Sequence, residues 1–87
     1  MSYAVDWSQR AQDELADLWT NATDRNAVTA AADEVERLLS RDPLGQGESR
    51  SGNRRILFEP PLSVLYRVDP KRRTVTVITV GPTGPRP

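Results

Sequence analysis

The sequence contains no cysteine and no histidine. The lack of cysteine excludes disulfide bonds, thiolate chemistry and cysteine-based zinc sites. The lack of histidine removes the commonest metal ligand and the side chain that most often acts as a general base near neutral pH. A Gly-rich phosphate loop is missing as well, so nothing supports a small-molecule enzyme. We therefore expect a protein that works without a metal or another cofactor.

Long apolar runs are also missing. No segment approaches the roughly 18 apolar residues that cross a bilayer. The first residues do not show the basic region followed by an apolar region that marks a secretory signal. We therefore expect a soluble, cytoplasmic protein that does not enter a membrane.

The chain is short and poor in apolar residues. Its 87 residues suffice for one domain, and only 37% of them are apolar and 6% aromatic, which is lean for so small a core. Small domains also bury a smaller fraction of their surface than large ones. A partner that covers apolar surface would therefore add stability, although many domains of this size fold unaided.

The charge is zero overall but unevenly distributed. Residues 1–43 carry four arginines against nine acidic residues, a net charge of −5, whereas residues 44–87 carry a net charge of +5. This asymmetry of charge between the two halves indicates that one face of the protein binds an anionic partner. The alternative is that two acidic helices lie beside a basic sheet and the charges only keep the protein soluble.

Two amphipathic helices are predicted in the first half, after a short strand over residues 3–7 with alternating polarity. Ser8 can cap the first helix, residues 9–22, whose apolar stripe is Ala11, Leu15, Leu18 and Trp19. Thr23 or Asp24 can cap the second, residues 25–41, whose stripe is Val28, Ala31, Val35, Leu38 and Leu39. Asp42-Pro43 ends it. The very short link predicts an antiparallel hairpin.

The second half predicts three strands. Residues 44–53 are predicted to be a loop, followed by strands over residues 54–59, 62–68 and 73–80, with turns at Pro60-Pro61 and at residues 69–72. The single domain is expected to cover residues 1–81, with residues 82–87 as a flexible tail.

The predicted fold is therefore α+β with the order β-α-α-β-β-β. The last three strands should form an antiparallel meander, and the helical hairpin should cover one face of the curved sheet. The other face stays partly open. It should expose some of Arg55, Leu57, Ser63, Leu65 and Arg67, or their neighbours if the register differs by one residue.

This order and several local segments resemble the RelE/ParE toxins of bacterial type II toxin–antitoxin systems, through almost the whole chain up to Val80. The matching segments are the strand that leads to Trp7-Ser8, Glu14-Leu15, Leu18-Trp19, Leu38-Leu39, Asp42-Pro43, Arg54-Arg55-Ile56, residues 64–69 and residues 75–81. Their order and spacing carry the likeness, because each segment alone is common.

The resemblance implies a toxin that a cognate antitoxin holds inactive. RelE-like members cut mRNA on the ribosome and ParE-like members poison DNA gyrase, and the fold cannot choose between these targets. The antitoxin is expected to fold as it wraps the sheet and helix surfaces. Whether the chain forms a homodimer stays open.

Arginines supply the candidate site residues. Arg55 and Arg67 are the candidate catalytic residues, and the candidate phosphate contacts are Arg50, Arg54, Lys71, Arg72 and Arg73. Each of these charges can also be merely solvated or ion-paired. Tyr66 could donate a proton, but its position in the alternation predicts that it faces the helices.

The family's catalytic set is incomplete in this sequence. Leu57 and Ser63 stand where RelE-like toxins often place arginines, and residues 82–85 replace a basic and aromatic end. Whether the chain is an endoribonuclease therefore stays open. The alternative to a toxin is an inactive relative that acts as a protein- or nucleic-acid-binding module.

Overall fold

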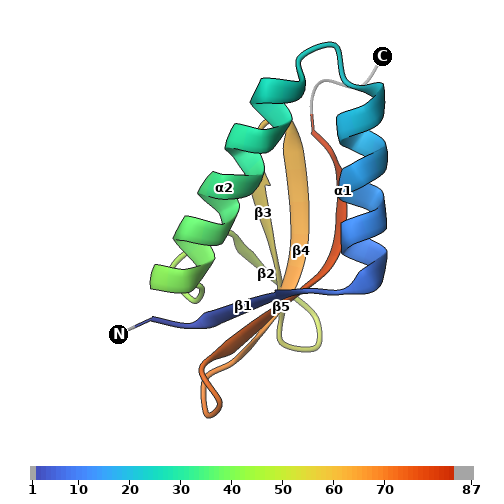
Figure 1. Cartoon of the computed structure of the whole chain (residues 1–87). Helices are drawn as coiled ribbons and strands as arrows, with labels where there is room; N and C mark the ends of the chain where they lie inside the picture. Colours follow the sequence, from blue (N-terminus) through green and yellow to red (C-terminus); the bar gives the residue numbers. More distant parts are fainter. Residues whose placement is uncertain (1, 84–87) are drawn as a thin grey trace.

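The computed structural model describes residues 2–83 as two helices on a five-stranded sheet (Figure 1). The elements are β1 (Ala4–Trp7), α1 (Gln9–Asn21), α2 (Arg25–Arg41), β2 (Glu48–Arg50), β3 (Arg54–Glu59), β4 (Leu62–Asp69) and β5 (Thr74–Pro82). This confirms the predicted α+β fold, with one strand more than expected.

Local signals place the helices where the sequence predicts them. The Ser8 hydroxyl accepts a hydrogen bond from the Ala11 amide at 3.1 Å, and the Asp24 carboxylate accepts one from the Ala27 amide at 3.1 Å. Both satisfy an N–H group that has no partner within the helix. No helix within residues 2–83 is long and apolar enough to span a membrane.

The sheet has the strand order β1-β5-β4-β3-β2. β1 pairs in parallel with β5, and the other neighbours are antiparallel. Both helices lie on the same side of this sheet (Figure 1). The expected helical hairpin on one face is therefore present, and no helix within residues 2–83 covers the opposite face of the sheet.

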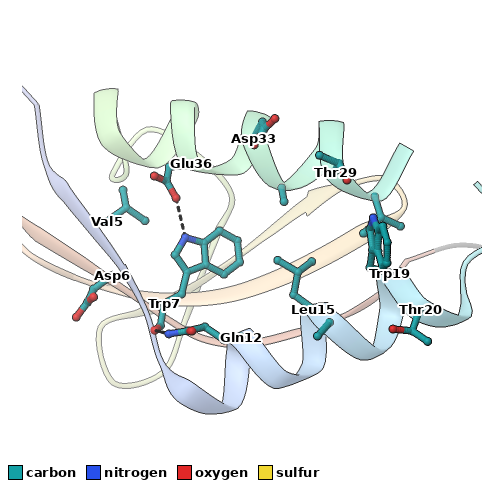
Figure 2. Close-up of a pocket in the computed structure, with 13 residues that line it drawn as sticks. Val5, Asp6, Trp7, Gln12, Leu15, Trp19, Thr20, Thr29, Asp33 and Glu36 are labelled. Atoms are coloured by element: carbon teal, nitrogen blue, oxygen red, sulfur yellow. Dashed lines mark hydrogen bonds between the residues drawn. The ribbon is translucent and has the colours of Figure 1, made fainter. Parts of the chain in front are cut away.

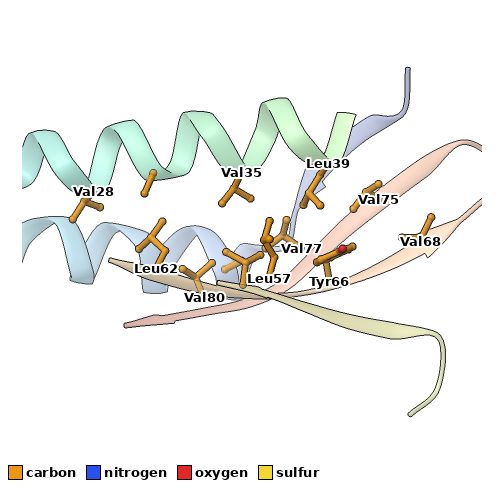
Figure 3. Close-up of a cluster of buried hydrophobic side chains, with 13 residues drawn as sticks. Val28, Val35, Leu39, Leu57, Leu62, Tyr66, Val68, Val75, Val77 and Val80 are labelled. Carbon is orange, nitrogen blue, oxygen red and sulfur yellow. The ribbon is translucent and has the colours of Figure 1, made fainter. Parts of the chain in front are cut away.

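The core lies between the helices and the sheet (Figure 3). β4 alternates strictly, because Leu62, Val64, Tyr66 and Val68 are buried and the residues between them are more exposed. α2 contributes Val28, Ala31, Val35 and Leu39, whereas α1 buries only Ala11 completely. Removing these apolar side chains from water is the main stabilising contribution.

β2 lies inside the segment predicted to be a loop. Its three residues, Glu48–Arg50, pair antiparallel with Ile56, Arg55 and Arg54 of β3. All three are exposed, so the strand is held by backbone hydrogen bonds at a sheet edge and shows no apolar alternation. A pattern search for buried residues misses such a strand.

The register predicted for β3 is wrong by one residue. Leu57 pairs with Val64 and belongs to the core, so Leu57 and Arg55 face the helices. Arg54, Ile56 and Phe58 occupy the open face, where Phe58 is 51% exposed. Three consecutive apolar residues at positions 56–58 satisfy either register, and packing against β4 decides between them.

Two further expectations are corrected. Trp19 was expected to be buried but is 43% exposed, because the side of α1 that carries it borders a groove and not the core. β5 continues to Pro82, and the Thr83 amide donates to the Pro61 carbonyl at 3.0 Å. The rest of the predicted tail, residues 84–87, lies outside the described residues.

Candidate functional site

Three arginines form a row across the open face of the sheet. Arg50 of β2 is paired with Arg54 of β3, and Arg54 is paired with Arg67 of β4. Residues paired directly across neighbouring strands project from the same face, with their Cβ atoms about 5 Å apart. The next partners in this row are Thr76 of β5 and Asp6 of β1.

The three guanidinium groups differ in what they contact. Arg50 lies 3.5 Å from a Glu48 carboxylate oxygen on the same strand, and Arg54 donates to the Ser51 carbonyl at 3.0 Å. Within residues 2–83, the Arg67 side chain has neither a hydrogen bond nor an ion pair. It is therefore the guanidinium with the largest unused capacity to donate hydrogen bonds.

Like charges directly opposite each other destabilise a sheet. Two such pairs, Arg50 with Arg54 and Arg54 with Arg67, follow one another here, and Glu48 is the only carboxylate ion-paired to this row within residues 2–83. An anion between the guanidiniums would relieve the repulsion. The row therefore has the charge and the donors to bind a phosphate group.

A hollow of about 490 Å³ lies beside the row at the turn between β4 and β5. Arg67 forms part of its wall together with Lys71, Arg72 and Thr76, so it joins the row to two more cations. The Asp69 carboxylate accepts from the amides of Lys71 and Arg72, at 3.1 and 3.2 Å, and so shapes the turn. Arg73, the last cation of this segment, instead lies over the Tyr3 ring at 5.7 Å.

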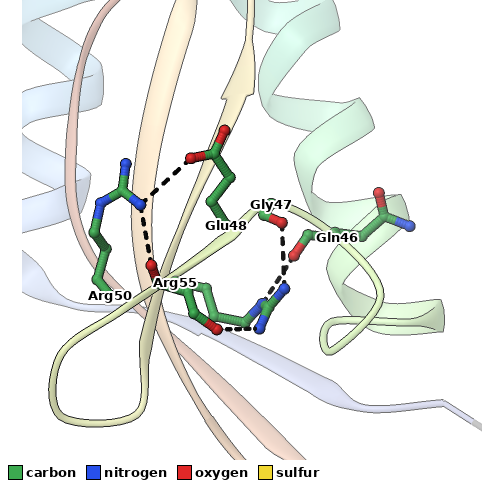
Figure 4. A network of polar contacts seen from close by, with 6 residues as sticks. Gln46, Gly47, Glu48, Arg50 and Arg55 are labelled. Atoms are coloured by element: carbon green, nitrogen blue, oxygen red, sulfur yellow. Dashed lines mark hydrogen bonds and ion pairs between the residues drawn. The ribbon is translucent and has the colours of Figure 1, made fainter.

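Arg55 lies on the other side of the sheet and is engaged by the loop before β3 (Figure 4). Its guanidinium donates to the carbonyls of Gln46 and Gly47, at 2.9 and 3.2 Å, and to the Ser49 hydroxyl at 2.9 Å. The expectation that Arg55 shares the open face with Arg67 is therefore wrong. Its contacts are those of a residue that positions the loop and β2.

Tyr66 contacts the same loop from the core. Its side chain is fully buried, and its hydroxyl lies 2.8 Å from both the Pro43 and the Gln46 carbonyl oxygens. Burial raises the pKa of Tyr66 above its usual value near 10, and the neighbouring Arg55 only partly opposes this shift. Tyr66 faces the helices, as predicted, and lies on the opposite side of the sheet from the arginine row.

The structure thus brings together Arg50, Arg54, Arg67, Lys71 and Arg72 of the predicted site residues. It separates Arg55 and Arg73 from them. Arg50 lies in the segment predicted to be a loop, so the sequence did not predict that β2 places it beside Arg54. The positive φ angles of Gly47 and Gly52, at 67° and 72°, flank β2, and these two glycines were the available signal for a hairpin there.

Comparison with known proteins gives a family and a set of similar folds. Residues 5–85 match the family model described as the ParE toxin of the type II toxin–antitoxin system parDE. No curated protein sequence matches the chain.

Three solved structures illustrate the fold. The RelBE2 toxin–antitoxin complex from Mycobacterium tuberculosis has a TM-score of 0.76 at 22% identity, covering 95% of this chain and 93% of that one. The chromosomal ParDE system from P. aeruginosa has a TM-score of 0.75 at 17% identity, covering 94% and 97%. A free variant of the E. coli toxin RelE has a TM-score of 0.69 at 20% identity, covering 94% and 84%. Because the family model spans nearly the whole chain, this protein belongs to the ParE toxin family of type II toxin–antitoxin systems.

Proposed function

We propose that this protein is the toxin of a type II toxin–antitoxin pair and that a cognate antitoxin holds it inactive. The observation that carries the proposal is the match of residues 5–85 to the ParE toxin model. Similar folds in complexes of toxins with antitoxins, from M. tuberculosis and from Pyrococcus horikoshii, support a protein partner.

We further propose that the toxin poisons DNA gyrase and does not cut RNA. The ParE family model supports this target, since ParE-like toxins act on gyrase. The chemistry of the open face supports it as well. An arginine keeps its proton and can hold a phosphate but cannot act as a base, and Tyr66 is buried on the other side of the sheet.

In this proposal the arginine row contacts a phosphate backbone. Arg67 is the central contact, because its donors are unused and it lies between Arg54 and the hollow that holds Lys71 and Arg72. Arg55 acts indirectly, through the loop that carries β2.

Ribosome-dependent mRNA cleavage is the second candidate, and Glu48 is the observation in its favour. Its side chain is 69% exposed beside Arg50, so a carboxylate that can accept a proton accompanies the row. Cleavage through a 2′-hydroxyl would need such a group next to the phosphate contacts.

Induced expression of the chain alone in bacteria separates these functions. We expect growth arrest with DNA breaks that disappear in cells with a gyrase variant resistant to poisons. Breaks mapped within translated mRNA, without DNA breaks, would support the endoribonuclease instead. Normal growth at high protein levels would contradict the toxin and favour a binding module.

A double variant that removes two charges, compared with a matched control, tests the arginine row itself. The double variant Arg54→Ala with Arg67→Ala should lower toxicity about tenfold or more, since each lost charge-assisted hydrogen bond contributes about 1.5–3 kcal/mol. The matched control is Arg10→Ala with Arg41→Ala, which removes two exposed arginines from the helices. Equal toxicity of the two double variants, with both proteins folded by circular dichroism, would exclude the row as the phosphate contact.

A further inference from the structure

β2 forms one edge of the sheet. The strand order places it last, and it pairs only with β3. No strand within residues 2–83 pairs with its outer side. Along that side the backbone N–H and C=O groups lack a strand partner, and such a row can pair with a strand of another chain. The backbone edge of β2 is therefore a candidate contact surface that the proposed function does not use.

Three of the usual protections of an edge strand are missing from β2. Proteins guard exposed edges with lysine, proline or a bulge. β2 contains neither lysine nor proline, and its register with β3 runs without a shift over all three residues. Its two charges have opposite sign and cancel, so they do not prevent the approach of an identical strand. The shortness of β2 is the remaining protection, and this lowers the strength of pairing without preventing it.

The loop before β2 and the side chain of Arg55 hold the strand in place (Figure 4). The Arg55 guanidinium donates to the Ser49 hydroxyl and to the Gln46 carbonyl, both at 2.9 Å. Gly47 lies so close to β3 that a Cβ atom there would collide with the Ile56 carbonyl oxygen. An edge that is already ordered loses little conformational entropy when another strand pairs with it.

The charges of β2 are complementary to those of a second copy in one arrangement. Antiparallel pairing centred on Ser49 puts Glu48 opposite Arg50 of the second copy, and Arg50 opposite Glu48 of the second copy. Opposite charges directly across two strands stabilise the pairing, whereas like charges destabilise it. Parallel pairing in register would instead place each charge against its own kind. The charges therefore favour the antiparallel arrangement.

Both charged side chains are accessible to a second copy. The Glu48 side chain is 69% exposed and the Arg50 side chain is 45% exposed. Both project from the open face, because their partners in β3 are Ile56 and Arg54. In the antiparallel arrangement two glutamates and two arginines thus meet in one cluster of alternating charge.

We infer that a second copy of this chain pairs antiparallel with β2 and forms a symmetric dimer centred on Ser49. The two sheets become continuous, and because paired residues project from the same face, the arginine rows of both copies lie on one face. Two three-residue strands bury far less than the roughly 1,200–2,000 Å² of stable interfaces, so the dimer is weak and depends on concentration. The inference does not rest on the proposed function.

Analytical ultracentrifugation of the full chain tests the dimer. Between about 10 μM and about 1 mM, where weak complexes form and dissociate, the average mass should rise from that of one chain toward that of two. Added salt should lower the mass again, because it screens exposed charges. A mass of one chain throughout this range, or an association that salt does not affect, would overturn the inference.

Charge exchange within β2 tests the arrangement. Glu48→Arg and Arg50→Glu each place like charges opposite each other in the symmetric dimer, and each should weaken self-association about tenfold or more. The double variant restores opposite charges and should associate as the unmodified chain does. An equal mixture of the two single variants should also associate, which shows that both are folded. Single variants that associate normally, or a double variant and a mixture that both stay monomeric, would overturn the inference.

A charge reversal away from β2 is the matched control. Arg10→Glu makes the same change of net charge as Arg50→Glu, at an α1 side chain that is 74% exposed, and should leave association unchanged. Hydrogen exchange at low and high protein concentration locates the contact. The β2 amides should gain protection, whereas those of β1, at the other edge of the sheet, should not. Equal weakening by the two reversals, or protection gained at β1 instead of β2, would overturn the inference.

Discussion

The two sides of the molecule carry opposite charge on different surfaces. The helix side has an apolar groove with Asp33 and Glu36 around it (Figure 2), whereas the sheet side carries Arg50, Arg54 and Arg67 in one row. The uneven charge of the sequence thus becomes two faces. The sheet separates them, because α1 and α2 cover only one of its sides (Figure 1).

This difference shows that one thin domain can offer two unlike binding surfaces. The acidic groove attracts cations and the arginine row attracts anions. One segment of a partner therefore cannot bind both surfaces, because each surface repels the charge that the other attracts. The proposed function accordingly assigns a phosphate backbone to the row.

The largest expected effect is on stability, when a leucine on each face of β4 is replaced by alanine. Leu62 faces the helices and is 1% exposed, so Leu62→Ala should lower the free energy of unfolding by about 2–5 kcal/mol. Leu65 is only half-buried on the open face, so Leu65→Ala should cost about 1 kcal/mol. Urea denaturation measures both; similar losses would mean that the open face is covered in solution.

The next largest expected effect is the loss of stability when the loop before β2 loses a contact with Tyr66. Tyr66→Phe removes the buried hydroxyl next to the Pro43 and Gln46 carbonyls, and should lower the free energy of unfolding by about 1–3 kcal/mol. The same loop leads into β2, so Arg50 should become more mobile while α1 and α2 keep their protection from hydrogen exchange. Unchanged exchange in β2 would show that the loop does not hold the row.

Tyr66 also makes the stability of the protein depend on pH. Burial raises the pKa of Tyr66 above 10, so the native state binds this proton more tightly than the unfolded state. The resulting stabilisation is fully present below about pH 10 and is lost as the pH rises through the native pKa. The difference in stability between the unmodified protein and Tyr66→Phe should therefore shrink above pH 10.

The smallest effect tests the repulsion within the row. Arg54→Glu replaces two like-charged cross-strand pairs with two opposite-charged ones, and should stabilise the protein by about 0.2–1 kcal/mol at low salt. The gain should fall when salt screens the exposed charges. A loss of stability, or a gain independent of salt, would show that the three guanidiniums do not repel one another.

Much of the fold was predictable because its signals are local. Ser8 and Asp24 cap the helices, Asp42-Pro43 ends α2, and the alternation in β4 identifies its buried face. The site was less predictable. Arg67 was placed correctly on the open face, whereas Arg54 and Arg55 were exchanged, because the apolar run at positions 56–58 fits either register.

The sequence by itself determined the elements, the burial of α2 and the opposite charge of the two halves, because helix periods, caps and strand alternation depend on near neighbours. Only the tertiary structure decided which arginines share a face and that Trp7 and Trp19 border one groove. Those facts depend on pairing between strands and on the spacing of two helices. Such contacts join residues far apart in the chain, and no local pattern records them.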